Sequence, residues 1–268
     1  MECLPFQEAT MQCPISSFSP ANTFLIIETF LLSVCLLQPL QKGGIYFGAG
    51  PHIVPPDYFN LPDIFYYTKL VTNPVGTSLT SSVGDVSHNY FIPVESINID
   101  AIPISLDKSL LLFDDNGVGG TKISTMVPYT TLQSSIYKAL INAYVEKATA
   151  VGIKRVAAVK PFEACFSTWR IGEGGAGLIV PTIEFDMWNR TSTTLTIRFY
   201  EPNSMVRVKK DVICLAFMDG GPNPRTSIVI GAHQLGDTVL QFDLVNMKLG
   251  YFPTLRLFNT NCSNIMPS

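Results

Sequence analysis

From residue 43 onward, short apolar runs alternate with clusters of turn-forming residues. Runs such as IFYYTKLVT (64–72) and TLTIRFY (194–200) are rich in β-branched and aromatic residues. In the second run, Leu195, Ile197 and Phe199 alternate with polar or small positions, which places them on one face of a strand. Gly, Pro, Asn and Asp separate the runs. The pattern predicts a mostly β domain over residues 43–268.

One segment has the spacing of a helix instead. Thr130 and Gln133 form a capping-box pattern, and Leu140 and Tyr144 belong to an apolar stripe at helical intervals. Gly152 follows as a C-terminal stop signal. We therefore expect one good helix that begins at Thr130 and ends before Gly152, with its apolar stripe packed into the core.

The first 42 residues differ from the rest. The apolar run FLIIETFLLSVCLL (24–37) is shorter than the roughly 20 residues of a membrane span, and Glu28 interrupts it. A signal peptide begins with positive charge, whereas the first basic residue here is Lys42. We expect residues 1–42 to be an atypical segment, either poorly ordered or produced by a misassembled gene model, and residues 43–268 to form the domain.

Composition and charge narrow the function classes. Hydrophobic residues make up 47% of the 268 positions and charged residues 15%, so the chain can bury a substantial core. The net charge of −3 argues against a nucleic-acid partner, because no basic excess is present to displace counterions. The basic cluster RVKK (207–210) is interpreted as the solvated edge of a strand. No membrane partner is expected.

The six cysteines contain no CxxC pair and the three histidines are scattered, so neither a metal nor a cofactor is expected. Two glycosylation sequons begin at Asn189 and Asn261. Such sequons are usable only in a secreted chain, and together with the cysteines they favour an oxidising compartment.

Two segments carry a resemblance to a known superfamily. GGTKISTMVPYTTLQSSIYKAL (119–140) resembles the second active-site segment of pepsin-like aspartic proteases, and TSIVIGAHQLGDTVLQFDLVNMKLGYF (226–252) resembles their closing segment. The resemblance covers about residues 43–268. It implies one lobe of the bilobed pepsin-like fold, mostly β with one or two helices, with the N-terminal lobe missing.

Within that superfamily the chain is most similar to one plant group. GVGGTKIST, KRVAAVKPFEACF, NSMVRVKKDVICLAFMDGG and NPRTSIVIGAHQL occur in order. They resemble the basic 7S globulins, extracellular dermal glycoproteins and xyloglucanase inhibitors, whose C-terminal domain is shared by plant xylanase inhibitors. The resemblance implies an extracellular or cell-wall protein, although no convincing signal peptide is present.

The resemblance places Ser124 at the position of the second catalytic aspartate. Aspartic proteolysis requires two carboxylates that share a proton, and a serine hydroxyl cannot hold that proton. No Asp-Thr-Gly or Asp-Ser-Gly occurs elsewhere in the 268 residues. The implied protein is a catalytically inactive pseudo-protease. A serine nucleophile is disfavoured as well, because His88 and His233 are distant in sequence and no Gly-x-Ser-x-Gly elbow exists.

Members of the resembled group inhibit microbial glycosidases through loops of this lobe, which implies a glycoside hydrolase as partner. A loop arginine suits that task, because its guanidinium can pair bidentately with catalytic carboxylates. Arg225 and Arg170 are the candidates. Two alternatives stay open: an active aspartic endopeptidase, and a seed storage or peptide-binding wall glycoprotein without a glycosidase target.

The resemblance also implies a disulfide between Cys165 and Cys214. The resemblance implies that the family partner of Cys262 belongs to the missing lobe, so Cys262 is expected to be unpaired or mispaired with the N-terminal segment. A lone lobe would also leave a sheet edge and an apolar patch open at the lobe junction, which favours self-association.

Overall fold

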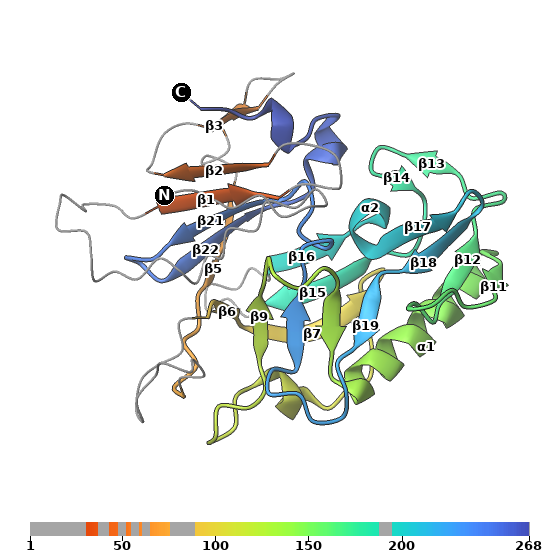
Figure 1. The fold of residues 1–268 in the computed structure, drawn as a ribbon, viewed down its shortest axis with the longest axis horizontal. Coiled ribbons are helices and arrows are strands. Elements are labelled where there is room, and N and C mark those ends of the chain that lie inside the picture. The colour runs from red at the N-terminus through yellow and green to blue at the C-terminus, as the bar shows by residue number, and fades with distance from the viewer. Residues whose placement is uncertain are drawn as a thin grey trace.

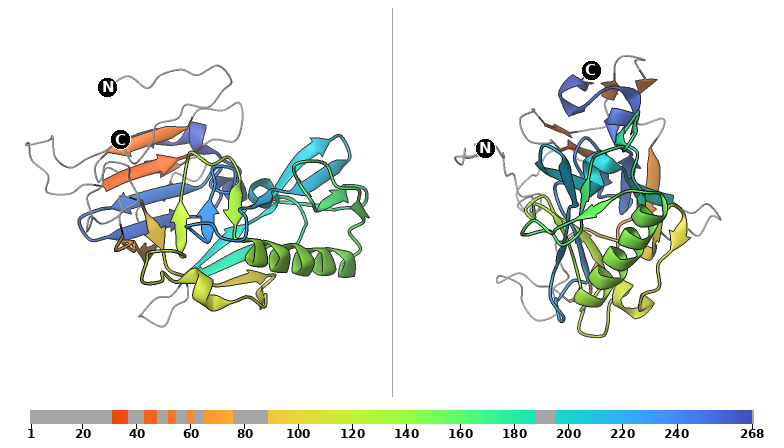
Figure 2. Two further views of the ribbon diagram at one scale, coloured as in Figure 1. Left: turned by 60° about the horizontal axis from the view of Figure 1, so that its bottom comes forward. Right: turned by 90° about the vertical axis from the view of Figure 1, so that its right-hand side faces the viewer.

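The computed structural model describes residues 31–36, 43–47, 52–54, 59–60, 65–75, 89–187 and 195–267, and these ranges form a mostly β lobe (Figure 1). The predicted fold class is confirmed. One long helix, α1 (Ser134–Ala150), packs at one side of the lobe. Figures 1 and 2 show a five-stranded sheet at the opposite side.

The five-stranded sheet is antiparallel throughout and has the order β2-β1-β21-β22-β5. Its strands are β2 (Gly44–Phe47), β1 (Leu31–Cys35), β21 (Val239–Asp243), β22 (Lys248–Phe252) and β5 (Tyr66–Lys69). Because β1 lies between β2 and β21, the start of the sequence and its C-terminal part build one sheet.

The expected boundary after residue 42 therefore does not divide the structure. Residues 31–36 lie inside the segment that the sequence sets apart, yet Leu32, Val34 and Cys35 are almost completely buried. The physical reason is alternation: Leu32 and Val34 face the main core, while Ser33 and Cys35 face the other side of the sheet. The rest of 1–42 lies outside the described residues.

A second five-stranded sheet, of mixed direction, has the order β19-β10-β20-β9-β6. Its strands are β19 (Phe217–Asp219), β10 (Thr130–Leu132), β20 (Ile228–Ile230), β9 (Thr121–Ile123) and β6 (Phe91–Ile92). β10 runs parallel to β19, and β20 runs parallel to β9. The segment that resembles a protease active site thus lies in the middle of this sheet.

Two four-stranded antiparallel sheets complete the larger elements. The first consists of β16 (Leu195–Phe199), β15 (Ile183–Met187), β7 (Val94–Ile99) and β8 (Ile102–Pro103), in that order. The second consists of β11 (Arg155–Val156), β12 (Cys165–Ser167), β18 (Val212–Leu215) and β17 (Met205–Lys209).

Smaller elements connect the sheets. β23 (Met266–Pro267), β3 (His52–Val54) and β4 (Phe59–Asn60) form a three-stranded sheet, and β13 (Glu173–Gly174) pairs with β14 (Gly177–Leu178). The short helices are α2 (Glu201–Ser204), η4 (Lys108–Leu111), η5 (Leu255–Phe258) and η6 (Cys262–Asn264).

Helix α1 begins later than its sequence predicts. Gln133 is the N-cap, and its side-chain oxygen accepts hydrogen bonds from the backbone N–H groups of Ser135 and Ile136. Thr130 belongs to β10, because its backbone continues the sheet beside β19 and β20. The C-terminal end agrees with the prediction, since Gly152 adopts a positive φ of 82° just after the helix.

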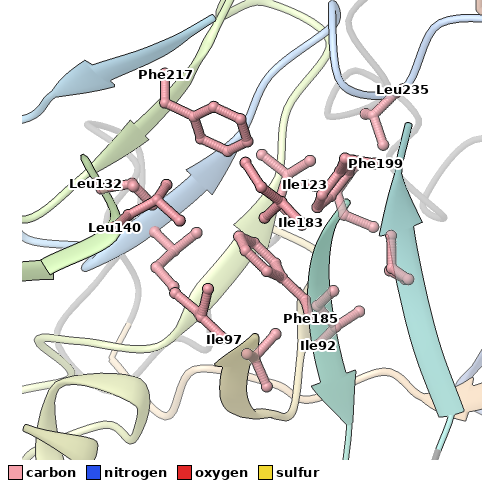
Figure 3. Packing of buried hydrophobic residues seen from close by; sticks show 14 of the residues in the cluster. Ile92, Ile97, Ile123, Leu132, Leu140, Ile183, Phe185, Phe199, Phe217 and Leu235 are labelled. Atoms are coloured by element: carbon pink, nitrogen blue, oxygen red, sulfur yellow. The ribbon is translucent and has the colours of Figure 1, made fainter. Parts of the chain in front are cut away.

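The main core lies between the sheets and α1. Phe185 and Phe199, on neighbouring strands, make an edge-to-face contact with ring centroids 5.0 Å apart. Phe199 contacts Phe217 in turn, at 6.2 Å. Figure 3 shows these rings packed with Leu132 and Leu140, which bring β10 and α1 into the same cluster. The core thus holds β10 and α1 together directly after the Ser124 loop.

Candidate functional site

The loop that carries Ser124 follows directly from β9. Ile123 donates its backbone N–H to the carbonyl of Tyr90 (3.0 Å), and Ser124 donates its own to the carbonyl of Ile230 (2.9 Å). Gly119, before the strand, has a positive φ of 112°, and a Cβ there would overlap the carbonyl oxygen of Leu112. The backbone of the resembled active-site loop is therefore fixed by two neighbouring strands.

The side chain of Ser124 is engaged locally. Its Oγ accepts a hydrogen bond from the backbone N–H of Met126 at 3.2 Å, which closes a small serine turn. Ser124 is half-buried, whereas Met126 has 51% of its surface exposed. The hydroxyl stabilises the turn and presents no charge to the surface.

No histidine base serves Ser124 within the part of the chain that the structure describes. The Nε2 atom of His233 lies 2.8 Å from the carbonyl oxygen of Met205, and its ring contacts Tyr129 at 5.5 Å between centroids. Burial lowers the pKa of His233 below its ordinary value, which keeps the ring neutral and able to donate to Met205. His88 and the side chain of His52 lie outside what the structure describes. The described position of His233 gives Ser124 no Ser–His pair.

A buried polar network holds the strand that follows the loop. Gln234 accepts hydrogen bonds from the backbone N–H and the hydroxyl of Thr130, at 2.8 and 2.9 Å, and its amide donates to the carbonyl of Ala216 at 2.7 Å. The Thr130 hydroxyl also accepts from the N–H of Gly231 at 3.1 Å. Gln234 was not among the residues predicted from the sequence. Its position three residues after the IVIG run was the available signal.

The loop of Arg225 connects β19 with β20 and is anchored on two sides. The carbonyl of Gly221 accepts from the N–H of Ser134 at 2.9 Å, at the start of α1. On the other side, the carbonyl of Arg225 accepts from the N–H of Gly119, and its guanidinium donates to the carbonyl of Asn116 at 3.3 Å. Arg225 itself is exposed.

The turn that contains Asn116 is also fixed. Asp114 Oδ1 accepts hydrogen bonds from the N–H groups of Asn116 (2.9 Å) and Val118 (2.7 Å). The Arg225 guanidinium therefore rests against a structured turn. An exposed arginine on a loop that is ordered in advance loses less entropy on binding a partner.

Arg170 lies far from Arg225. Its turn follows β12, whose Ser167 donates to the carbonyl of Lys154, just beyond the end of α1. The Arg225 loop contacts the other end of α1, and a helix of 17 residues is about 25 Å long. Figure 1 shows the two loops at different places on the lobe. The structure does not bring the two candidate arginines into one site.

Cysteine pairing follows two patterns. Cys165 and Cys214 face each other on β12 and β18 and form a disulfide, with an S–S distance of 2.09 Å. Cys262 is bonded to Cys35 at 2.02 Å, so it is joined to the N-terminal segment and is not unpaired. No free cysteine occurs among the described residues.

Of the two sequon residues, Asn189 and Asn261, the structure describes only Asn261. Asn189 lies outside the described residues. Asn261 caps η6, where its side chain accepts from the N–H of Ser263 at 2.9 Å. It lines a small polar pocket of about 250 Å³ with Arg256 and the β13–β14 turn. Glycosylation at either residue stays a prediction.

Within the described ranges, no group of three or more His, Cys, Asp or Glu side chains could hold a metal ion. No helix in those ranges is both long and apolar enough to cross a membrane.

Comparison with known proteins then places the fold. The chain is similar to the crystal structure titled edgp, with a TM-score of 0.82, 43% identity, and coverage of 87% of this chain and 56% of that one. It is also similar to basic 7S globulin from soybean, with a TM-score of 0.65, 25% identity, and coverage of 89% and 54%. These neighbours have the pepsin-like fold, which confirms the predicted architecture.

Proteins with similar sequences belong to the same plant group. "Probable aspartic proteinase GIP2" of Nicotiana benthamiana is 42% identical over 233 residues, which are 87% of this chain and 52% of the relative. "Gamma conglutin 1" of Prunus dulcis is 37% identical, with 87% and 49% covered. The chain thus spans about half the length of these relatives. The model named "Xylanase inhibitor C-terminal" matches residues 89–253, and the chain belongs to that family.

Proposed function

We propose that this chain is a catalytically inactive, aspartic-protease-like protein that inhibits a glycoside hydrolase of the xyloglucanase or xylanase class. The main support for the proposal is that Arg225 is exposed on a loop that is hydrogen-bonded both to the start of α1 and to the Asn116 turn. Membership in the xylanase inhibitor C-terminal family supports the partner class. The relatives are about twice as long as the part that this chain matches. The inhibitory activity of a full-length protein is therefore only proposed for this chain.

The proposed lack of peptidase activity is based on Ser124. Its hydroxyl is used by the Met126 N–H, and a dyad of carboxylates cannot form around it. One relative is named a probable aspartic proteinase, so peptidase activity is the alternative that an assay must address. The conglutin and globulin names of other relatives favour the second alternative, a seed or wall protein without a glycosidase target.

Arg225 would enter the cleft of the hydrolase. A glycosidase cleft contains two carboxylates, and a guanidinium pairs with carboxylates through two parallel hydrogen bonds. Burial of that pair makes its loss costly, because truncation of one partner leaves the other charged group desolvated. Two disulfides fit a location outside the cell, where thiols are oxidised.

The test is inhibition of a panel of xyloglucanases and xylanases by the full chain. Arg225→Ala should weaken inhibition of the target by roughly 30-fold or more, and Arg225→Lys should restore only part of it because lysine lacks the planar fork. Arg170→Ala is the matched control and should change inhibition by less than about twofold. Failure to inhibit any panel member, or unchanged inhibition by Arg225→Ala, would overturn the proposal.

A further inference from the structure

One end of the four-stranded sheet β11-β12-β18-β17 gathers residues from three separate segments. Ser167, at the end of β12, donates to the carbonyl of Lys154 at 2.9 Å, and Thr168 donates to the carbonyl of Asp211 at 3.0 Å. Val212, at the start of β18, pairs with Lys209 at the end of β17. We call this surface the basic end; it comprises Lys154, Trp169, Arg170, Lys209 and Lys210.

The basic end carries an unusually exposed tryptophan. Thr168–Ile171 form a tight turn, closed by the N–H of Ile171 on the carbonyl of Thr168 at 3.2 Å. Trp169 and Arg170 occupy its tip, where Arg170 has a φ of 66° and Trp169 has 76% of its surface in solvent. Tryptophan is highly buried on average in folded proteins. A rigid turn that holds an indole in water indicates a contact surface.

Exposed cations lie on the segments that meet at this turn. Lys154, Arg170, Lys209 and Lys210 are all exposed, and among the residues that the structure describes none of them takes part in an ion pair. Arg207 donates to the carbonyl of Lys210 at 2.7 Å, which holds the β17–β18 turn. The nearby acids are Asp211 and Glu173, both exposed.

This local excess contrasts with the rest of the chain. The whole sequence has a net charge of −3, yet cations outnumber acids at the basic end. Figures 1 and 2 show the β17–β18 hairpin projecting from the lobe, away from the five-stranded sheet. A projecting surface suits a linear polymer that lies across it.

We propose that the basic end binds an acidic polysaccharide made of uronic-acid units. The cations would pair with the carboxylates along the polymer, and the indole of Trp169 would cover the apolar C–H face of one sugar ring. The tryptophan favours a sugar polymer over polyanions that lack rings, because a polymer without rings gains nothing from an apolar plane. The surface is distinct from the Arg225 loop, so this inference does not depend on inhibition of a glycosidase.

The first experiment measures binding of the full chain to polygalacturonate at low salt. Lys209→Glu combined with Lys210→Glu should weaken binding by about tenfold or more, and added salt should weaken wild-type binding steeply. The control exchanges two exposed lysines elsewhere, Lys138→Glu with Lys248→Glu, for the same change in net charge. Equal losses in the two double variants would show that net charge alone attracts the polymer, which would overturn the proposal.

The second experiment separates sugar recognition from charge. Trp169→Ala should weaken binding to polygalacturonate by roughly fivefold or more, and should leave binding to polyglutamate, a polyanion without sugar rings, unchanged. Fully methyl-esterified polygalacturonate keeps the rings but loses the charges and should bind far more weakly. No effect of Trp169→Ala, or a preference for polyglutamate, would overturn the proposal and indicate an acidic protein as the partner. Trp169, Lys209 and Lys210 are exposed, so these variants should fold normally.

Discussion

Cys35 and Cys262, 227 residues apart in the sequence, are joined by a disulfide between β1 and η6. Both are almost fully buried, and the N–H of Cys262 donates to Asp237 Oδ1 at 3.4 Å. The bond fixes β1 to the opposite end of the chain. Strand β1 also pairs with β21, in the sheet that contains β22.

Removal of this disulfide should destabilise the lobe strongly. In the chain-entropy model, a closed loop of 227 residues contributes about 5 kcal/mol, against about 4 kcal/mol for the 49-residue separation of Cys165 and Cys214. We expect the Cys35→Ser/Cys262→Ser double variant to lose at least as much free energy of unfolding as Cys165→Ser/Cys214→Ser, measured in urea. Wild-type stability in the first variant, or free thiols at Cys35 and Cys262 in the native protein, would contradict this.

The hydrogen bonds of Gln234 should make the second large contribution to the free energy of unfolding. Gln234→Leu leaves the Thr130 N–H and the Ala216 carbonyl without their buried partner. Each unsatisfied buried group costs about 1–3 kcal/mol, so the free energy of unfolding should fall by about 2–6 kcal/mol. Thr130→Ser keeps the hydroxyl and should cost less than about 1.5 kcal/mol. A loss in Gln234→Leu no larger than that of Thr130→Ser would show that the network is dispensable.

Local patterns predicted the strands and the end of α1, because alternation and a C-terminal glycine act over a few residues. The start of α1 was predicted wrongly. Thr130 and Gln133 fit a capping box, but the backbone of Thr130 is held between β19 and β20, and its hydroxyl bonds to Gln234, 104 residues away. A tertiary contact of that range overrides a local cap signal.

The same limit applies to β1. The run at 24–37 fits neither a membrane span nor a signal peptide when seen alone. Only its pairing with β21 shows that Leu31–Cys35 is an inner strand of a sheet. The Arg225 anchor was equally hidden, since Asn116 lies 109 residues away. In contrast, the assignment of Ser124 to the position of a catalytic aspartate rests on the local sequence resemblance alone and stays a prediction.

Stability should fall as the pH drops below the ordinary pKa of histidine. Burial lowers the pKa of His233, and the Met205 carbonyl opposes this only in part. A folded-state pKa below the unfolded value gives stability that is complete above about pH 6.5 and is lost as the pH falls through the folded pKa. His233→Gln removes this dependence. The free energy of unfolding of the wild type, minus that of His233→Gln, should therefore decrease as the pH falls. A difference that stays constant would show that His233 does not titrate differently on folding.

Self-association should involve the edge of the five-stranded sheet. Among the described strands, β2 and β5 are the outer ones, and Ile45 on β2 has 40% of its surface exposed. An open edge pairs readily with another chain, and a lysine on the edge prevents this. We expect a mass that rises with concentration in light scattering, and a lower mass for Ile45→Lys. Leu112→Lys, at an exposed apolar residue outside the strands, is the control and should behave as the wild type.

We expect no peptidase activity from the wild type, and none from Ser124→Asp. An aspartate at this position can still accept the Met126 N–H, so the variant should fold, as near-ultraviolet circular dichroism would verify. It nevertheless supplies only one carboxylate. Aspartic proteolysis needs a second carboxylate so that one group activates water while the other donates a proton.

The 268 residues contain no Asp-Thr-Gly or Asp-Ser-Gly that could supply this partner. General acid–base assistance is typically worth about 10²–10⁴-fold, and it is lost when either group is absent. The assay is hydrolysis of a denatured protein substrate between about pH 2 and about pH 7, the range in which carboxylates titrate. Pepstatin-sensitive cleavage by the wild type would overturn the pseudo-protease assignment. Cleavage by Ser124→Asp alone would require a second acid close to residue 124, within the chain or from another copy of it.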